Sequence, residues 1–327
     1  MRRYSFKVLS LNWPYISTIY FDATKIHEEN MIPYLGEFSG LLTAICWSLT
    51  SIAFTAASRR VGALQVNLYR LPAALLLLGL TYFIFWGNIN LDSNAVLWLI
   101  ASGVVGLAIG DTFLFQAMVM IGARLSMILM SLAPPIAAIL AYFFLNEIIS
   151  PLGILGIAVT VMGVGWVVAE RTPTKGGKNQ RISLKGVVFG TLAAAGQAVG
   201  LILAKKGLIT DIHPIMATLI RMIGATIILW PLAIFTNQIQ SPIKVFSRDK
   251  SAIKWMIIGI IFGPYLGVTF SLIAVKYTQT GIAATLMSTM PVLMLPMVIF
   301  IEKEKPTWRA VIGAFVAVAG IAILFLR

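Results

Sequence analysis

The chain has 327 residues, of which 59% are hydrophobic and only 11% are charged. A soluble protein of this size carries about 25% charged residues, because these residues cover its surface. The composition therefore excludes a water-soluble enzyme of ordinary design, and the mean hydropathy of +0.90 agrees. Because a transmembrane helix uses about 20 apolar residues, the apolar residues suffice for about ten such helices.

The first residues differ from the rest of the chain. Residues 1–35 are predicted to form an N-terminal tail that begins basic, but Asn12 and Pro14 interrupt its apolar stretch. This pattern is a poor signal peptide. A disordered tail and a misassigned upstream start both explain it, and the sequence does not choose between them.

Ten apolar blocks follow, each of 19–25 residues, which is long enough to cross a bilayer. Strands are not expected, because the blocks are continuously apolar rather than alternating. In chain order the predicted spans are 36–57, 64–86, 95–119, 125–145, 151–169, 184–204, 214–236, 254–275, 282–301 and 307–326.

The longest polar break, 171–183, reads as a flexible linker between two five-span repeats, 36–170 and 184–327. Several residues recur in the two halves at an offset of 157 positions. These pairs are Gly106 and Gly263, Gly110 and Gly267, Pro134 and Pro291, Glu147 and Glu304, Gly156 and Gly313, and Gly163 and Gly320. Because five is odd, successive repeats enter the membrane from opposite sides, as in many secondary transporters. The predicted fold is an all-α membrane protein with ten transmembrane helices in two inverted five-helix repeats.

These features resemble the drug/metabolite transporter superfamily in its ten-helix, EamA-type branch. The resemblance rests on the proline-containing fourth and ninth spans, each followed by a Glu nine residues before a Gly, on Trp47, and on the arginines that open spans two and seven. It implies a bacterial inner-membrane protein, a monomer or homodimer, that moves amino acids, metabolites, sugars or drugs, often by proton-coupled export.

The orientation signals conflict. The side of the membrane with the breaks after spans 1, 3, 5, 7 and 9 carries 15 basic residues, counting those in the first turn of the following span, and the opposite side carries 8 at most. By the positive-inside rule both termini then lie outside the cytoplasm. The resemblance implies both termini inside, so the orientation stays open. The net charge of +13 is explained by lipid headgroups rather than by nucleic acid.

Three ionisable residues lie well inside the predicted spans: Arg70, Asp111 and Arg221. A charge at the membrane centre costs about 2.5–3.5 kcal/mol on insertion scales, so each needs a partner or a wet cavity. Asp111 is either a protonatable carboxylate of the transport pathway or part of an ion pair with Arg70, Arg221 or Lys276. Val268 occupies the matching position of the second repeat. Each arginine either snorkels or pairs structurally, or else binds a carboxylate or phosphate of the substrate. Asp111 and one arginine together could hold a zwitterion.

Other candidates for the pathway are weaker. Polar or aromatic residues within spans could line a cavity, although helix packing is the simpler explanation; these are Trp47, Gln116, Gln197 and Tyr265. Prolines in spans four and nine remove backbone donors and predict kinks, either for gating or as plain architecture; these are Pro134, Pro135 and Pro291. The paired glycines of spans three and eight allow close helix approach.

The sequence favours a secondary active transporter that moves a small solute by alternating access, with protons as a possible coupling ion. It has no Walker loop, zinc motif or Gly-x-Ser-x-Gly elbow, so no enzyme activity, metal or cofactor is expected. The single cysteine, Cys46, allows no intrachain disulfide. A non-transporting membrane scaffold or sensor and a passive channel are the alternatives.

Overall fold

The computed structural model describes residues 34–85, 92–145, 148–169, 172–173, 179–180, 183–208, 212–241, 249–278, 280–303 and 306–325. The predicted tail lies almost wholly outside these ranges, as do Glu147 and Glu304 and most of the predicted linker. Apart from the first residue of α2, all helices belong to one unit, Gly36–Arg327.

The helices of the first repeat are α2 Leu35–Val61, α3 Ala63–Phe85, α4 Ser93–Ser102, the π-helical segment η1 Gly103–Gly110, α5 Asp111–Met130, α6 Ala133–Leu145 and α7 Pro151–Val168. Those of the second are α8 Leu184–Leu208, α9 Pro214–Phe235, α11 Lys250–Ile260, η2 Ile261–Gly267, α12 Val268–Tyr277, α13 Thr280–Met287, α14 Met290–Met297, η3 Val298–Glu302 and α15 Trp308–Phe325. Two antiparallel two-residue strands, β1 Thr172–Pro173 and β2 Asn179–Gln180, lie in the predicted linker.

Eight continuous helical stretches are long and apolar enough to cross a membrane, and two shorter apolar helices, Ala133–Phe144 and Trp308–Leu324, join them. One of the eight, Ser93–Met130, bends at Gly122, where φ is 82° and ψ is 164°. That conformation is accessible to glycine and strained for other residues. Residues 123–130 therefore belong with α6 to the fourth span, as the predicted gap between spans three and four required. The predicted ten-helix, two-repeat fold is confirmed.

The repeat extends to the irregular parts of the helices. Helices α4 and α11 begin 157 residues apart, and so do α5 and α12, and α7 and α15. Asp92 and Asp249 cap α4 and α11 in the same way, each accepting a hydrogen bond from the backbone N–H two residues on. The π-helical segments η1 and η2 occupy matching positions in spans three and eight, so the sequence repeat is also a repeat of backbone geometry.

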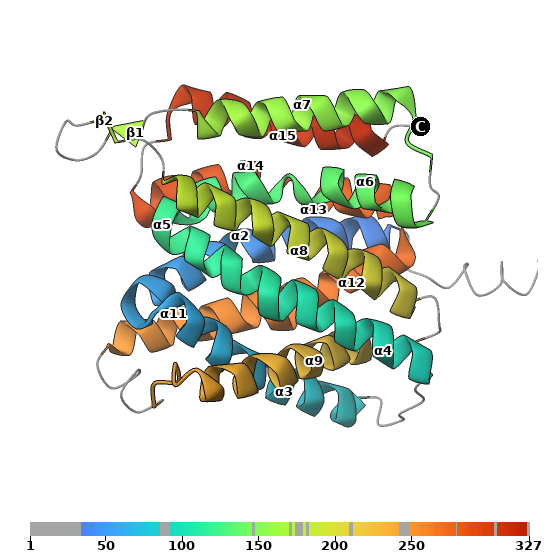
Figure 1. Ribbon diagram of the computed structural model, residues 1–327, viewed down its shortest axis with the longest axis vertical. Coiled ribbons are helices and arrows are strands. Elements are labelled where there is room, and N and C mark those ends of the chain that lie inside the picture. The colour runs from blue at the N-terminus through green and yellow to red at the C-terminus, as the bar shows by residue number, and fades with distance from the viewer. Residues whose placement is uncertain are drawn as a thin grey trace, which may run out of the picture. The chain divides into compact units, whose positions relative to one another are not determined.

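Helices α7 and α15, which end the two repeats, lie side by side (Figure 1). Glycines bring their backbones into contact. A Cβ on Gly156 would lie 2.3 Å from the backbone N of Leu324, and one on Gly163 would lie 2.7 Å from that of Ala317. In lipid the hydrophobic effect does not drive helices together. Close packing at small residues such as these glycines contributes to their association instead.

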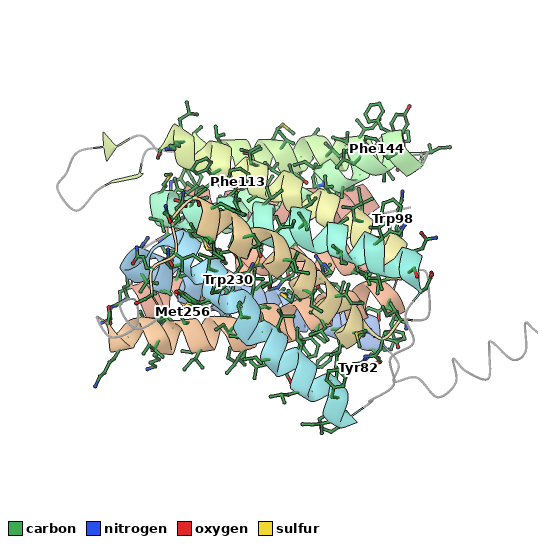
Figure 2. The ribbon with its side chains drawn as sticks, turned by 60° about the horizontal axis from the view of Figure 1, so that its bottom comes forward. Tyr82, Trp98, Phe113, Phe144, Trp230 and Met256 are labelled. Atoms are coloured by element: carbon green, nitrogen blue, oxygen red, sulfur yellow. The ribbon has the colours of Figure 1, made fainter. Side chains whose placement is uncertain are left out.

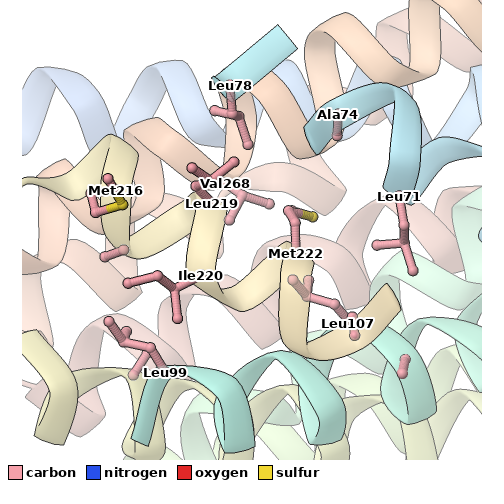
Figure 3. Packing of buried hydrophobic residues seen from close by; sticks show 14 of the residues in the cluster. Leu71, Ala74, Leu78, Leu99, Leu107, Met216, Leu219, Ile220, Met222 and Val268 are labelled. Atoms are coloured by element: carbon pink, nitrogen blue, oxygen red, sulfur yellow. The ribbon is translucent and has the colours of Figure 1, made fainter. Parts of the chain in front are cut away.

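Apolar side chains also cover the outside of the helix assembly. Phe144 is 73% exposed (Figure 2), and many other large apolar residues are exposed too, as expected of faces that contact lipid. The largest internal cluster joins the repeats: Figure 3 shows Leu219, Ile220 and Met222 of α9 between side chains of α3 and Leu99 of α4.

Candidate functional site

A cavity of about 660 Å³ lies among helices of both repeats. Seven of the candidate residues line it: Trp47, Arg70, Asp111, Pro134, Gln197, Arg221 and Pro291. The structure therefore brings together all three ionisable residues predicted inside the spans. Neither arginine extends to the surface, because Arg70 is 3% exposed and Arg221 is 4% exposed.

Arg70 and Asp111 form a buried ion pair. Arg70 Nη2 donates to Oδ2 of Asp111 at 2.5 Å, and the two side chains are 3% and 8% exposed. The remaining carboxylate oxygen, Oδ1, accepts a hydrogen bond from Nε2 of Gln197 at 2.5 Å. Arg70 also donates from Nε to Oδ1 of Asn67 at 2.9 Å and from Nη2 to the carbonyl of Leu107 at 3.1 Å. Both members of the pair are thus well supplied with partners.

The backbone around Asp111 explains how these groups meet. Asp111 follows the π-helical segment η1, where the helix returns to α geometry. Such wide turns are frequent at functional sites. On the same helix, Gly106 and Gly110 allow α8 to approach so closely that Cβ atoms on Gly200 and Gly196 would lie 3.0 Å and 2.9 Å from their Cα atoms. This approach carries Gln197 of α8 to the carboxylate.

The glycines of span eight act in the same way on the other side. Cβ atoms on Gly263 and Gly267 would each lie 2.7 Å from a side-chain atom of α2, in Thr50 and Trp47 respectively. Spans three and eight therefore each pack closely on the first span of the opposite repeat, α8 and α2. Through these two contacts the repeats enclose the cavity between them.

Arg221 enters the cavity from α9 and is attracted by Asp111, but it forms no direct ion pair with a carboxylate of the described residues. No residue in the described part of the chain accepts a hydrogen bond from its buried Nε atom. Its backbone is fixed against η1, because a Cβ on Gly103 would lie 1.9 Å from the Arg221 carbonyl oxygen. The position that would supply a second carboxylate by the repeat holds Val268, which also lines the cavity. The pairing of charges is thus asymmetric between the repeats.

The predicted kinks in spans four and nine are present. Turns at 131–132 and 288–289 interrupt the helices at matching positions, just before Pro134 and Pro291. Prolines lack the amide hydrogen, so the carbonyls of Met130 and Met287 lose their usual helical partners. Both interrupted segments line the cavity, through Ser131 and Ser288 among others.

Three candidates lie elsewhere. Gln116 lines a separate polar pocket of about 370 Å³ with Gln65, Gln238 and Gln240. The hydroxyl of Tyr265 shares a hydrogen bond with Thr81 at 2.8 Å, and the residues that line the larger cavity do not include it. Pro135, beside Pro134, is also not among them. Gln116 and Tyr265 are thus polar residues within spans that do not line the larger cavity.

Several residues that line the cavity were not predicted from the sequence. Thr50 and Phe54 follow Trp47 at three and seven positions, which places all three on one face of α2. This helical spacing from the one aromatic candidate of the first span could have found them. Phe115 of α5 faces the same cavity and lies 5.0 Å from the guanidinium carbon of Arg70, measured to the ring centroid.

Comparison with known proteins gives a consistent result. The pattern of the EamA-like transporter family matches residues 34–169 and 184–326. An uncharacterized transporter of Archaeoglobus fulgidus is 23% identical over 287 residues, which cover 88% of this chain and 96% of the relative. A solved protein crystal structure shares the fold, with a TM-score of 0.62 at 14% identity, over 88% of this chain and 95% of that one. The family pattern covers most of the chain in two repeats, and the chain therefore belongs to the EamA-like transporter family, as an integral membrane protein with a transporter function.

Proposed function

We propose that this protein is a secondary active transporter that moves a small organic solute by alternating access. The observation that supports this most is the cavity of about 660 Å³ between the repeats, which contains all three ionisable residues predicted inside the spans. Binding sites of inverted-repeat transporters lie at the repeat interface near the bilayer midplane. Buried charges are costly there, so a cluster of them around a cavity favours a role in transport over packing.

The cavity reaches one end of the helices. Its lining includes Ile148 and Ile282, which are 92% and 40% exposed, and Lys205 in the last turn of α8. We infer that solute enters and leaves from this end in the conformation described. This end carries the breaks that are poor in basic residues.

Contacts between the repeats close the opposite end. Arg60 Nη1 donates to Oδ2 of Asp249 at 2.6 Å, which joins the end of α2 to the start of α11. Nearby, Gln65 Nε2 donates to the carbonyl of Gln238 at 2.6 Å, and the backbone N–H of Gln240 donates to Gln65 Oε1 at 3.3 Å. Alternating access requires these contacts to break when the cavity opens to this end.

Proton coupling through Asp111 is the mechanism that this geometry favours. In the conformation described, the Asp111 carboxylate is bound by the Arg70 guanidinium and by Gln197. If the helices separate during opening, an unpaired buried carboxylate is costly, and a proton can take the place of the guanidinium. Asp111→Asn then keeps solute exchange but loses accumulation driven by a pH gradient. Equal gradient-driven accumulation by the variant and the parent protein would contradict this role.

Alternating access can be tested without knowing the solute. In a Cys46→Ser background, Ser288→Cys places a thiol in the cavity, and an exposed Ser251→Cys on a second variant reports the orientation in vesicles. A membrane-impermeant maleimide should label Cys at 288 from the Lys205 end. Adding Asp249→Asn should raise labelling from the opposite end and lower it from the first. Equal labelling from both ends would indicate a channel, and labelling that the added substitution leaves unchanged would indicate a static scaffold.

A further inference from the structure

The cavity contains more positive than negative charge. We propose that its substrate is a small organic anion with an apolar body, and that the anionic group binds Arg221. This assignment of substrate class rests on the proposed transport function of the same cavity. It differs from the zwitterion suggested by the sequence, because the structure commits Asp111 elsewhere.

The positive and negative charges of the cavity do not balance. Among the described residues that line the cavity, Asp111 is the only carboxylate, whereas Arg70 and Arg221 both carry a positive charge. Arg70 holds Asp111 at 2.5 Å, and Gln197 holds the other oxygen at 2.5 Å. Asp111 also attracts Arg221, but one carboxylate shared between two guanidinium groups leaves a net positive charge in the cavity, so Arg221 favours an anion there. A substrate ammonium group would compete with Arg70 for the one carboxylate.

Three polar atoms of the cavity have no hydrogen bond to the described residues. Arg221 Nε, Thr50 Oγ1 and Ser131 Oγ are buried, have no partner among the described residues, and belong to residues that line the cavity. Buried polar atoms are nearly always satisfied by protein, water or ligand. All three groups can donate, and a guanidinium fork suits the two oxygens of a carboxylate. The set therefore matches an acceptor-rich, anionic group.

The rest of the cavity wall indicates what the remainder of the solute is. This wall is largely apolar and contains large, adaptable side chains. Examples are Trp47, Phe54, Phe115, Met118, Met130 and Met287. Aromatic rings offer flat apolar surfaces, and methionines fit irregular shapes. An inorganic anion would leave this surface unused, so the occupant is an organic anion.

The test is binding by the purified protein in detergent, measured by calorimetry with four probes that share a phenylpropyl skeleton. We expect 3-phenylpropionate to bind, and 3-phenylpropylamine and 3-phenylpropanol to bind at least tenfold more weakly. L-Phenylalanine, which adds an ammonium group to the first probe, should also bind more weakly. Binding of the amine, the alcohol or the amino acid as tightly as the carboxylate would overturn the proposal, because the first two lack the anionic group and the third adds a positive charge.

Variants locate the anion. Arg221→Gln should weaken binding of 3-phenylpropionate about 10- to 100-fold, the usual effect of losing a hydrogen bond to a charged group. Arg221→Lys should keep part of it. Arg309→Gln is the matched control, because this arginine is exposed and packs on Trp308. Unchanged binding of 3-phenylpropionate by Arg221→Gln would refute the assignment of the anionic group to Arg221. If that variant fails to fold, the ranking of the four probes by the parent protein still tests the anionic substrate class.

Failure of the two proposals can be distinguished. If 3-phenylpropionate binds through Arg221 but labelling of the cavity thiol never changes sides, the substrate class stands and the transport mechanism fails. If the thiol changes sides but the probe ranking is absent, alternating access stands and the anion assignment fails.

Discussion

The Arg70–Asp111 pair makes a quantitative prediction. The atoms in contact are 2.5 Å apart and the side chains are 3% and 8% exposed, so solvent screens the pair little. With charge centres about 4 Å apart and an effective dielectric constant of about 20, the attraction is about 4 kcal/mol. Asp111→Asn leaves the buried arginine unpaired, and Arg70→Gln leaves the buried carboxylate unpaired. Each single change should therefore destabilise the protein by about 3–5 kcal/mol.

The double variant should cost much less than the sum of the two single changes. Asn and Gln amides can hydrogen-bond to each other and to Gln197, and neither charge of the pair remains buried. The expected coupling energy in the double-mutant cycle is about 3 kcal/mol. Reversible unfolding of the purified protein in mixed micelles measures it, with Asp92→Asn as the control for an exposed carboxylate. Additivity of the single changes within about 0.5 kcal/mol would show that the pair does not stabilise the fold.

Two further predictions test helix packing and the closed end. Gly103→Ala should destabilise the fold by about 1–3 kcal/mol or more, because its Cβ would lie 1.9 Å from the Arg221 carbonyl oxygen. A Cβ at Gly79 meets nothing within 4 Å, so Gly79→Ala should leave the stability unchanged or raise it slightly. Equal melting temperatures of the two variants would contradict this prediction. The hydrogen bond from Arg60 lowers the pKa of Asp249, so the contact is present at neutral pH and lost as the pH falls through that lowered pKa. Carboxyl-carbon NMR of labelled Asp should show the pKa of Asp249 rise in Arg60→Gln, and an unchanged titration would refute the contact.

The helices and their repeat could be predicted from the sequence. The number of spans follows from the apolar content of the chain. In lipid the backbone polar groups must form their hydrogen bonds within each helix, so helix formation depends on the local sequence alone. The gap predicted between spans three and four contains Gly122, where the helix bends. The matching prolines and glycines at an offset of 157 likewise appear at matching positions of the fold. The conclusion that Arg70, Asp111 and Arg221 need partners also followed from the cost of charge in a membrane.

Only the tertiary structure decided which partners meet. Asp111 had three candidate partners, of which the packing of α5 against α3 selects Arg70, while Lys276 instead donates to the Ile212 carbonyl at 3.2 Å. The close approach of η1 to α8 adds Gln197, which was not among the three. The same packing leaves Arg221 in the cavity without a direct ion pair to any carboxylate that the structure describes. Such choices depend on contacts between residues far apart in sequence, and in lipid these contacts are set by how closely small residues let helices approach. Apolar periodicity carries no such information, so the sequence determined which residues cross the membrane and the packing determined which of them form the site.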